Sequence, residues 1–369
     1  MATYYSSHNA AGGGAGTVGD PFTLQELFDT CTTGDTGYIL NTGTYTPSVT
    51  LDIDINTGSN VQPLHFIGVN ASDGITKEMV TISGSSLGAG DDLLDFGITG
   101  SYCIMEYLRL TAATRYNVYA DQNNLVLIFK NCRVDSATSH GMYCSSSNQE
   151  QIFIDSEIDS NGGSGYDVLT SARGGIQTIR CAIHDNTGDG IRDGQGSLLG
   201  QTKKPLHIGS VFYNNGGDGL EFIGSGGSYG GGIIDNCVFF NNTGNGLSIV
   251  STHGFVSVSR SIFRSNGGYG IYLTGGYSDI LIHCDYNDSS NNTSGAIDVN
   301  GGVLPGVGNI TIDPQFVSEI DGSEDFTPQN ANLYIQNTFP GGVGGTSYEY
   351  IGAIQPKRKI FLGAGIVLK

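Results

Sequence analysis

The sequence predicts an all-β solenoid, a stack of coils built from short strands. The first observation is a glycine that recurs within residues 117–295 at steps of 24 to 29 residues. The second is that a Cys/Ser column and an Asn column keep step with it. Such a period indicates supersecondary units that bury their apolar faces only by stacking on one another. The columns are Gly141, Gly165, Gly190, Gly219, Gly246, Gly270 and Gly295; Cys132, Ser156, Cys181, Ser210, Cys237, Ser261 and Cys284; and Asn161, Asn186, Asn215, Asn242 and Asn266.

The apolar residues decide which kind of repeat is present. They alternate with polar residues, as at Ile152 and Ile154 or Val256 and Val258, and lack the spacing of helical repeats. A period of about 24 residues leaves room for three short strands per coil, with coils about 4.8 Å apart. We therefore expect the small Cys and Ser side chains to fill an inward corner and the Asn column to form an amide ladder. The glycines are expected to supply turn conformations.

The composition fits one elongated domain. A length of 369 residues would suggest two or three globular domains, but a solenoid grows in one dimension. We expect an N-terminal arm at 1–20, a solenoid at 21–356 and a C-terminal tail at 357–369. The seven cysteines are an odd number without a CxxC pair, so we expect buried free thiols.

The charge narrows the classes of partner. Sixteen Lys and Arg against 35 Asp and Glu give a formal net charge of −19, which argues against nucleic acid and against an anionic membrane surface. No apolar run approaches about 20 residues, so membrane insertion is not expected. The first residues lack the basic and apolar regions of a signal peptide, although a chain from which one had been removed would look the same.

A short helix is expected over about 23–31. Thr23 and Glu26 form the pattern of a capping box, in which each side chain accepts a hydrogen bond from the other residue's backbone. Leu24, Leu27 and Phe28 make one apolar face. We expect this helix to cover the open end of the solenoid, because an uncovered first coil would leave unpaired strand edges.

The two ends of the solenoid resemble a known superfamily. The helix is followed by GDT, a strand at 38–40 and GTYT, and the far end contains DPQFVS at 313–318, DFTPQNANLYIQNT at 325–338 and IGAIQP at 351–356. These segments resemble the opening and closing coils of the pectin-lyase-like superfamily. The resemblance implies a right-handed, single-stranded parallel β-helix, here of about 10–12 coils. It implies no single activity, because the superfamily contains many.

Two columns flank the repeated glycine and are expected to face outward. On neighbouring rungs they bring acidic residues and one arginine into a patch. Asp167 and Glu221, two rungs apart, would lie roughly 9–10 Å from each other, which suits the acid and base of an inverting glycosidase. The catalytic candidates are Asp167, Glu221, Asp189, Asp218 and Arg192, and the candidates for stacking on sugar rings are Tyr143 and Tyr272.

A structural interpretation of these columns remains open, in which alternating charges solvate the sheet and Arg192 offsets its acidic neighbours. The polygalacturonases that resemble this fold carry NTD, DD, GHG and RIK motifs, whereas this chain has only SHG at 139–141, THG at 252–254 and an Asp-Asp pair at 91–92. No calcium pattern of the pectate lyases is present, so no cofactor is expected and calcium is unsupported. Histidines 140, 184, 207, 253 and 283 have no metal-site spacing and are expected at the surface.

The tail differs in composition from the rest of the chain. Its residues are basic and apolar, which is unusual for free coil on an acidic solenoid. Three interpretations are open: a cap packed over the last coil, a segment that docks on a neighbouring subunit or another protein, or a remnant of cloning. The assembly candidates in this tail are Lys357, Arg358, Lys359, Ile360, Phe361 and Leu362.

Two hypotheses about function follow. The first is a non-enzymatic protein of a bacteriophage particle, such as a capsid decoration protein or tail spike, on the virion surface. It would be a rigid acidic rod, a homotrimer anchored to other virion proteins through its termini. The alternative is a secreted or spike-borne polysaccharide hydrolase or lyase, or a polysaccharide-binding spike, that uses the acidic patch. The sequence favours the first and leaves the second open.

Overall fold

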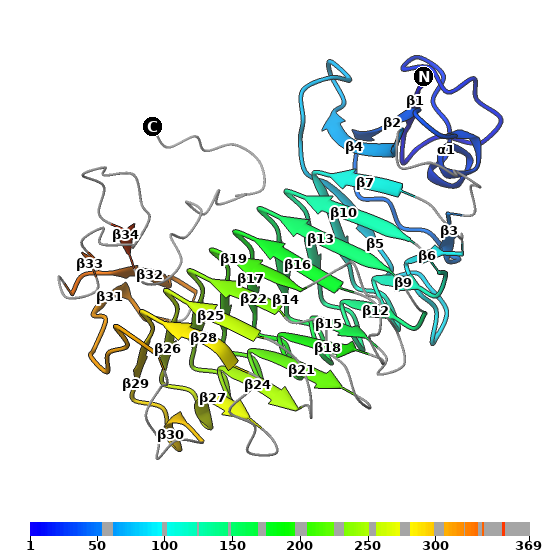
Figure 1. Cartoon of the computed structure of the whole chain (residues 1–369). Helices are drawn as coiled ribbons and strands as arrows, with labels where there is room; N and C mark the ends of the chain where they lie inside the picture. Colours follow the sequence, from blue (N-terminus) through cyan, green and yellow to red (C-terminus); the bar gives the residue numbers. More distant parts are fainter. Residues whose placement is uncertain are drawn as a thin grey trace.

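The computed structural model is a solenoid whose coils stack along one axis (Figure 1). It describes residues 1–53, 62–97, 102–123, 125–146, 149–168, 175–195, 205–224, 232–250, 256–273, 281–298, 306–320, 322–330, 334–335 and 349–350. Within these residues three parallel sheets run the length of the solenoid, with 11, 9 and 10 strands. Three strands per coil and parallel stacking are therefore confirmed. No helix in these ranges is long and apolar enough to cross a bilayer.

The strands of each sheet follow one another coil by coil. The 11-stranded sheet contains β1 (Thr3–Ser6), β2 (Thr36–Asn41), β4 (Leu64–Asn70), β7 (Tyr102–Glu106), β10 (Val126–Lys130), β13 (Glu150–Ile154), β16 (Gly175–Ile179), β19 (Leu206–Ile208), β22 (Gly232–Asp235), β25 (Val256–Ser259) and β28 (Leu281–Asp285). The nine-stranded sheet contains β5 (Val80–Ser83), β8 (Leu108–Thr111), β11 (Arg133–Asp135), β14 (Glu157–Asp159), β17 (Ala182–His184), β20 (Val211–Tyr213), β23 (Val238–Phe240), β26 (Ile262–Arg264) and β29 (Asp288–Ser290).

The ten-stranded sheet contains β3 (Leu51–Asp52), β6 (Leu94–Phe96), β9 (Val118–Ala120), β12 (Met142–Cys144), β15 (Tyr166–Val168), β18 (Ile191–Gln195), β21 (Leu220–Gly224), β24 (Leu247–Val250), β27 (Tyr269–Leu273) and β30 (Gly295–Ile297). Two antiparallel pairs follow, β31 (Phe316–Ser318) with β32 (Asp325–Pro328) and β33 (Tyr334–Ile335) with β34 (Glu349–Tyr350).

The interior is filled by side chains that stack from rung to rung. Phe212, Phe239 and Phe263 occupy one inward column with ring centroids 4.8 Å apart between neighbours. The Asn ladder is also present: the Asn161 Nδ2 donates to Asn186 Oδ1 at 2.9 Å, and the same contact repeats down the column. These amides are buried and bonded to one another, so they stabilise the stack and take no part in chemistry.

The Cys/Ser column is an inward corner as expected. All seven cysteines are buried free thiols, and Ser side chains accept from the backbone of the preceding rung, as Ser156 Oγ does from Cys132 N at 3.1 Å. Cys284 does not belong to this column. Cys284 pairs with Val258 and so lies three residues before the column position, where Asn287 accepts from Ser261 N instead. The assignment of Cys284 from spacing alone was wrong.

The repeated glycines are needed for close packing of the coils, not for the turn conformations that we expected. Left-handed backbone at the corners is taken by other residues, such as Asn131, Arg180 and Asp185. The repeated glycines are needed because the next coil lies against them: a Cβ on Gly165 would lie 2.7 Å from the Gly190 carbonyl oxygen. Gly295 leaves this column as well, because it pairs with Tyr269.

The N-terminal end is closed as the capping box predicts. The helix α1 (Leu24–Thr30) begins after Thr23, whose Oγ1 accepts from Glu26 N, and it buries Leu24, Leu27 and Phe28. The expected N-terminal arm is instead built into the fold. Thr3–Ser6 forms β1, which pairs in parallel with β2 and extends the 11-stranded sheet (Figure 1).

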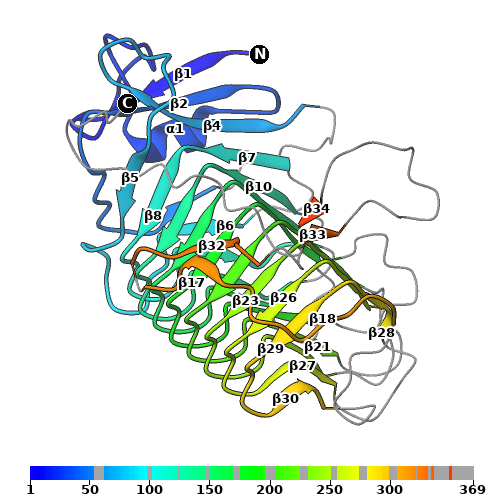
Figure 2. The same ribbon diagram turned by 90° about the vertical axis from the view of Figure 1, so that its left-hand side faces the viewer.

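The C-terminal residues fold back over one outward face. The pair β31 and β32 lies along the nine-stranded sheet (Figure 2). Phe316 and Phe326 pack there against Val211, Tyr213 and Phe240. Arg264, which points outward from β26, forms ion pairs with Asp313 and Glu319 at the edge of this segment. Half of that face is therefore covered, whereas no described residue covers the ten-stranded sheet in this way. The tail at 357–369, with its assembly candidates, lies outside the described residues.

Candidate functional site

The outward column on the ten-stranded sheet is a continuous ladder. Alternation along each short strand sends the central residue outward, because the residues on either side fill the core. Parallel pairing then sets these central residues side by side on successive rungs. In order they are Tyr119, Tyr143, Asp167, Arg192, Glu221, Ser248 and Tyr272.

Arg192 lies between the two acidic members of this ladder. Its Nη1 is 3.6 Å from Asp167 Oδ2 and its Nε is 3.4 Å from Glu221 Oε2. Both separations are long for a charge-assisted hydrogen bond, which typically spans about 2.7–2.9 Å. Asp167 Oδ1 is buried and accepts a hydrogen bond from none of the described residues. The charged groups of this ladder therefore lie close together, but Asp167 keeps an acceptor oxygen that no described residue occupies.

His140 is the second neighbour of Asp167. Its Nδ1 accepts a hydrogen bond from the Ser164 backbone N–H at 3.0 Å. The neutral ring therefore carries its proton on Nε2, which lies 3.4 Å from Asp167 Oδ2. Burial lowers the pKa of His140 and favours this neutral form. The sequence placed His140 at the surface without a role, whereas in the structure it is half-buried beside the acidic ladder.

The two carboxyl groups have different electrostatic environments. Burial raises the pKa of Asp167, but His140 and Arg192 oppose that rise and favour its ionised form. Burial together with Asp189 and Asp218 raises the pKa of Glu221 to about 7, with Arg192 opposing. One group is thus poised to carry a proton near neutrality while the other is held by two donors. Burial raises the pKa of both groups, and Glu221 is the one whose pKa reaches the neutral range that suits a general acid.

Asp189 and Asp218 belong to the neighbouring column and cap the backbone. Asp189 Oδ1 accepts from Asp218 N at 2.7 Å, and Asp218 Oδ1 accepts from Asn245 N at 2.5 Å. Asn245 Oδ1 continues the series by accepting from Tyr269 N. These two residues connect successive coils by accepting from backbone N–H groups, a role that was not predicted from the sequence.

Aromatic side chains lie at both ends of the acidic ladder. Tyr143 stacks on Tyr116 with centroids 4.8 Å apart, and Tyr116 also stacks on Tyr119 and His140. At the other end Tyr272 stacks on Tyr269 at 6.0 Å. Tyr116 was missed in the sequence because it precedes the clearest repeats; its place three residues before Tyr119, matching His140 and Tyr143, was the available signal.

A guanidinium completes the first aromatic group. Arg115 lies 5.0 Å from the Tyr116 ring centre and 5.2 Å from that of Tyr119, and it is bound by the Asp92 carboxylate. The Arg115 charge is therefore matched by Asp92. We call Tyr116, Tyr119, Tyr143 and His140 the tyrosine stack.

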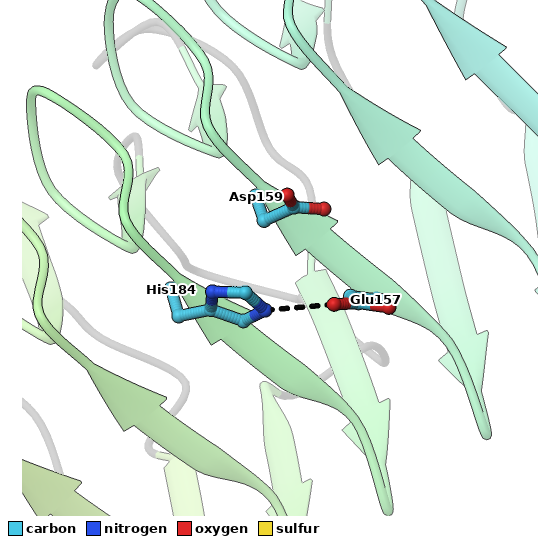
Figure 3. A group of neighbouring side chains, drawn as sticks. All are labelled: Glu157, Asp159 and His184. Atoms are coloured by element: carbon cyan, nitrogen blue, oxygen red, sulfur yellow. Dashed lines mark hydrogen bonds and ion pairs between the residues drawn. The ribbon is translucent and has the colours of Figure 1, made fainter. Parts of the chain in front are cut away.

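A second group of acidic and histidine side chains lies on the nine-stranded sheet. Figure 3 shows Glu157, Asp159 and His184 on adjacent strands, close enough to suggest a metal site. However, His184 Nε2 lies 2.9 Å from Glu157 and its Nδ1 lies 2.7 Å from Asp185. Both ring nitrogens donate, and the pKa of His184 is raised to about 9 by these carboxylates against the effect of burial. A protonated imidazole has no lone pair for a metal ion.

Two of the histidines expected at the surface are buried. His184 is enclosed by the ion pairs just described, and His207 lies in the core, where its Nδ1 contacts Thr178 Oγ1 at 2.8 Å. Burial lowers the pKa of His207 to about 3, so this ring is neutral. Neither residue faces the acidic ladder, so neither is a candidate for chemistry there.

Comparison with known proteins supports the fold. Residues 116–293 match the family model described as a right handed beta helix region. The structure resembles that of the pectate lyase Pel9A, at 16% identity and a TM-score of 0.69 over 96% of each chain.

Two weaker matches are a rhamnogalacturonan lyase and an alginate lyase from Paenibacillus. The first has 13% identity and a TM-score of 0.49 over 78% of this chain and 87% of that one. The second has 14% identity and a TM-score of 0.46 over 80% and 97%. A search of curated proteins by sequence gives no match. The chain is a right-handed parallel β-helix, a fold that it shares with the pectate lyase Pel9A.

Proposed function

We propose that this protein cleaves a polysaccharide at the ladder formed by Asp167, Arg192 and Glu221. The observation that carries the proposal is the pair of carboxyl groups two rungs apart on one outward ladder, with the loosely held Arg192 guanidinium between them and a pKa of about 7 at Glu221. The structural likeness to a pectate lyase over nearly the whole chain supports polysaccharide chemistry on this fold. It assigns no residue, because the identity is 16%.

Glu221 is the proton donor in this proposal. With a pKa of about 7 it is substantially protonated near neutrality. As the bond from the anomeric carbon to the glycosidic oxygen breaks, Glu221 transfers its proton to that oxygen and the leaving sugar keeps a hydroxyl group.

Asp167 is the base. It accepts a proton from a water molecule whose oxygen forms the new bond to the anomeric carbon on the opposite side from the leaving group. Two rungs separate the backbones of Asp167 and Glu221 by about 9–10 Å, which leaves room for this water. Glu221 ends as the carboxylate and Asp167 as the acid, and exchange with solvent restores both.

Arg192 lies between the two groups and contacts both. It favours the ionised forms of both carboxyl groups, but Asp167 has the additional contact with His140. The arginine is half-exposed and loosely bound, so a sugar can displace its guanidinium from between the carboxyl groups. We regard Arg192 as a positioning residue.

The virion interpretation keeps only its support from the sequence. Its main argument was the basic and apolar tail at 357–369, which lies outside the described residues. A homotrimer, virion partners and a place on the virion surface remain predictions, and so does secretion under the alternative. None of them conflicts with cleavage, because a spike can carry a polysaccharide-cleaving site.

The test is activity on a panel of neutral and acidic polysaccharides. New reducing ends should appear with the wild-type protein and fall by about 100-fold or more in Glu221→Gln and Asp167→Asn, as expected for loss of a general acid or base. Absence of products from every polymer, or full activity in both variants, would overturn the proposal.

The matched control is Asp155→Asn. Asp155 is also acidic and paired with an arginine, Arg180, at 2.7 Å, but it lies at the corner between the other two sheets. Its variant should cleave at the wild-type rate.

A further inference from the structure

We infer that the polymer cleaved at this ladder is a neutral polysaccharide, not a polyuronate. The inference rests on the proposed function and names its class of substrate. It does not follow from the fold, since the similar structures include lyases of acidic polymers. It follows from the charges and side chains that the described residues place on this face.

The first argument is the balance of charge along the ladder. Between the tyrosine stack and Tyr272, the two outward columns contain Asp167, Asp189, Asp218 and Glu221 against Arg192. Four carboxyl groups and one guanidinium give −3 when all are ionised, or −2 when Glu221 is protonated. His140 adds no charge in its neutral form. The whole chain has the same sign, with a formal net charge of −19.

The second argument is that Arg192, the cation that the described residues place within the acidic segment, is already shared. Arg192 lies within 3.6 Å of Asp167 and 3.4 Å of Glu221, so its single charge is divided between two carboxyl groups. Arg115, beside the tyrosine stack, is bound by Asp92. A uronate that took either arginine would leave the displaced carboxylate facing the new one. Two like charges this close repel one another strongly on a protein surface, so the exchange would weaken binding.

The third argument is that the remaining features suit uncharged sugars. Carboxylates accept hydrogen bonds readily, and each hydroxyl group of a neutral sugar can donate one. The tyrosine stack ends at Tyr143 and His140 because the next rung carries Asp167 and Ser164, which have small side chains. An aromatic ring whose neighbour is small offers its face to the apolar face of a sugar.

The same arrangement is repeated at the far end. Tyr269 and Tyr272 follow a rung that carries Asn245 and Ser248. The acidic segment is thus bounded by aromatic rings on both sides along the axis of the solenoid. Tyr143 and Tyr272 are five rungs apart, or about 24 Å at the usual strand spacing. A polymer lying along the axis would contact both ends and cross Asp167 and Glu221 between them.

The experiment uses pairs of polymers that differ only in charge. Pectate, alginate and glucuronan are each compared with the same polymer after reduction of its carboxyl groups to hydroxymethyl groups. Binding to the full-length Asp167→Asn protein is measured by affinity electrophoresis at low salt, with chelator and again with added calcium. Cleavage by the wild-type protein is measured alongside.

We expect at least one reduced polymer to bind about 10-fold or more tightly than its acidic parent, because like charges brought together cost several kcal/mol. Preference for an acidic parent, with or without calcium, would overturn the inference while leaving the proposed function intact. Binding and cleavage of no polymer in either form would instead overturn the proposed function.

Two variants test why the protein would bind the reduced polymer more tightly than its acidic parent. Asp218→Asn keeps an oxygen to cap Asn245 N but removes a charge, so it should narrow the preference for the reduced polymer. Tyr116→Ala, in the tyrosine stack, should weaken binding of that polymer. An unchanged preference in Asp218→Asn would contradict the electrostatic explanation.

Discussion

The outward faces of the nine-stranded and ten-stranded sheets both carry acidic and basic residues, but the two sets are paired differently. On the nine-stranded sheet Arg133 donates two hydrogen bonds to Asp159, at 2.8 and 2.7 Å. Arg109 likewise donates to Asp135 at 3.0 and 2.5 Å. On the ten-stranded sheet Arg192 reaches its carboxyl partners only at 3.4 and 3.6 Å.

This difference separates a structural ladder from a candidate site. The charges on the nine-stranded sheet are bidentate, and the apolar half of the same face is covered by β31 and β32. The charged groups of such a face are hydrogen-bonded to one another, and these bonds stabilise the fold. The ten-stranded face has a buried carboxylate oxygen that no described residue satisfies, beside a guanidinium that is held only loosely. Groups left in that state are typical of functional sites, where stability is given up for chemistry.

The largest expected effect is on activity. Asp167→Asn should lower the rate of cleavage by about 100-fold or more, because Asn cannot take a proton from water. The matched change on the other face, Asp159→Asn, should leave the rate per folded molecule near that of the wild type. Initial rates on the preferred polymer check this, and equal losses in the two variants would remove the distinction between the faces.

The next effect concerns the covered half of the nine-stranded face. Phe326 is fully buried against Phe316, Tyr213 and Phe240, so Phe326→Ala should cost about 3–5 kcal/mol in local stability. We expect faster proteolysis within 306–330 while the solenoid stays folded. Cleavage of the polymer should be unaffected, and a loss of activity would contradict the separation of the two faces.

Replacing each aspartate by asparagine should change the free energy of unfolding by different amounts. Asp159→Asn should cost about 1–3 kcal/mol, since it weakens a bidentate pair whose arginine is partly exposed. Asp167→Asn should change stability by less than about 0.5 kcal/mol, because its ion pairs are loose and its burial opposes the charge. Chemical denaturation of both variants measures the difference, and an equal cost would argue that Asp167 is also structural.

The smallest effect is a dependence of stability on pH. The folded pKa of Glu221 is raised to about 7 from 4.5, so the fold favours the protonated acid and loses stability as pH rises from about 4.5 to about 7. Glu221→Gln should therefore be more stable than the wild type above about pH 7, and the gain should vanish below about pH 4.5.

His184 also lowers stability as pH rises, but over a higher range of pH than Glu221. Its folded pKa is raised to about 9 from 6.5, so its contribution is complete below about pH 6.5 and is lost as pH rises through about 9. His184→Gln should be less stable than the wild type at pH 6, with a difference that shrinks at high pH. Thermal melts across pH measure both profiles, and changes of stability that fall in the same pH range for the two variants would contradict the assignments.

Much of the fold could be predicted from the sequence because stacking turns spacing into contact. Steps of 24 to 29 residues brought Asp167, Arg192 and Glu221 onto neighbouring rungs, and the capping box placed α1. Spacing failed at Cys284 and Gly295 because the last coil is longer than the step suggested: Cys284 pairs with Val258 and Gly295 with Tyr269, so both fall short of their columns. A local irregularity of this kind leaves no periodic signal.

How closely the charged side chains approach their partners could not be predicted from the sequence. Spacing cannot distinguish the tight Arg133 pair from the loose Arg192 pair, because both are arginines beside aspartates on adjacent rungs. It also could not tell that β31 and β32 would cover one outward face, since those residues lie beyond the repeats. The side chains that cap backbone amides, such as Asp189, look in sequence like those that do not.

The most direct test of the central claim is the anomeric configuration of the first sugar released, followed by NMR during cleavage of the preferred polymer. An acid and a base two rungs apart predict inversion, because water attacks from the side opposite the leaving group. A product that retains the configuration of the polymer, or one that carries a new carbon–carbon double bond, would contradict the assignment of Glu221 as acid and Asp167 as base.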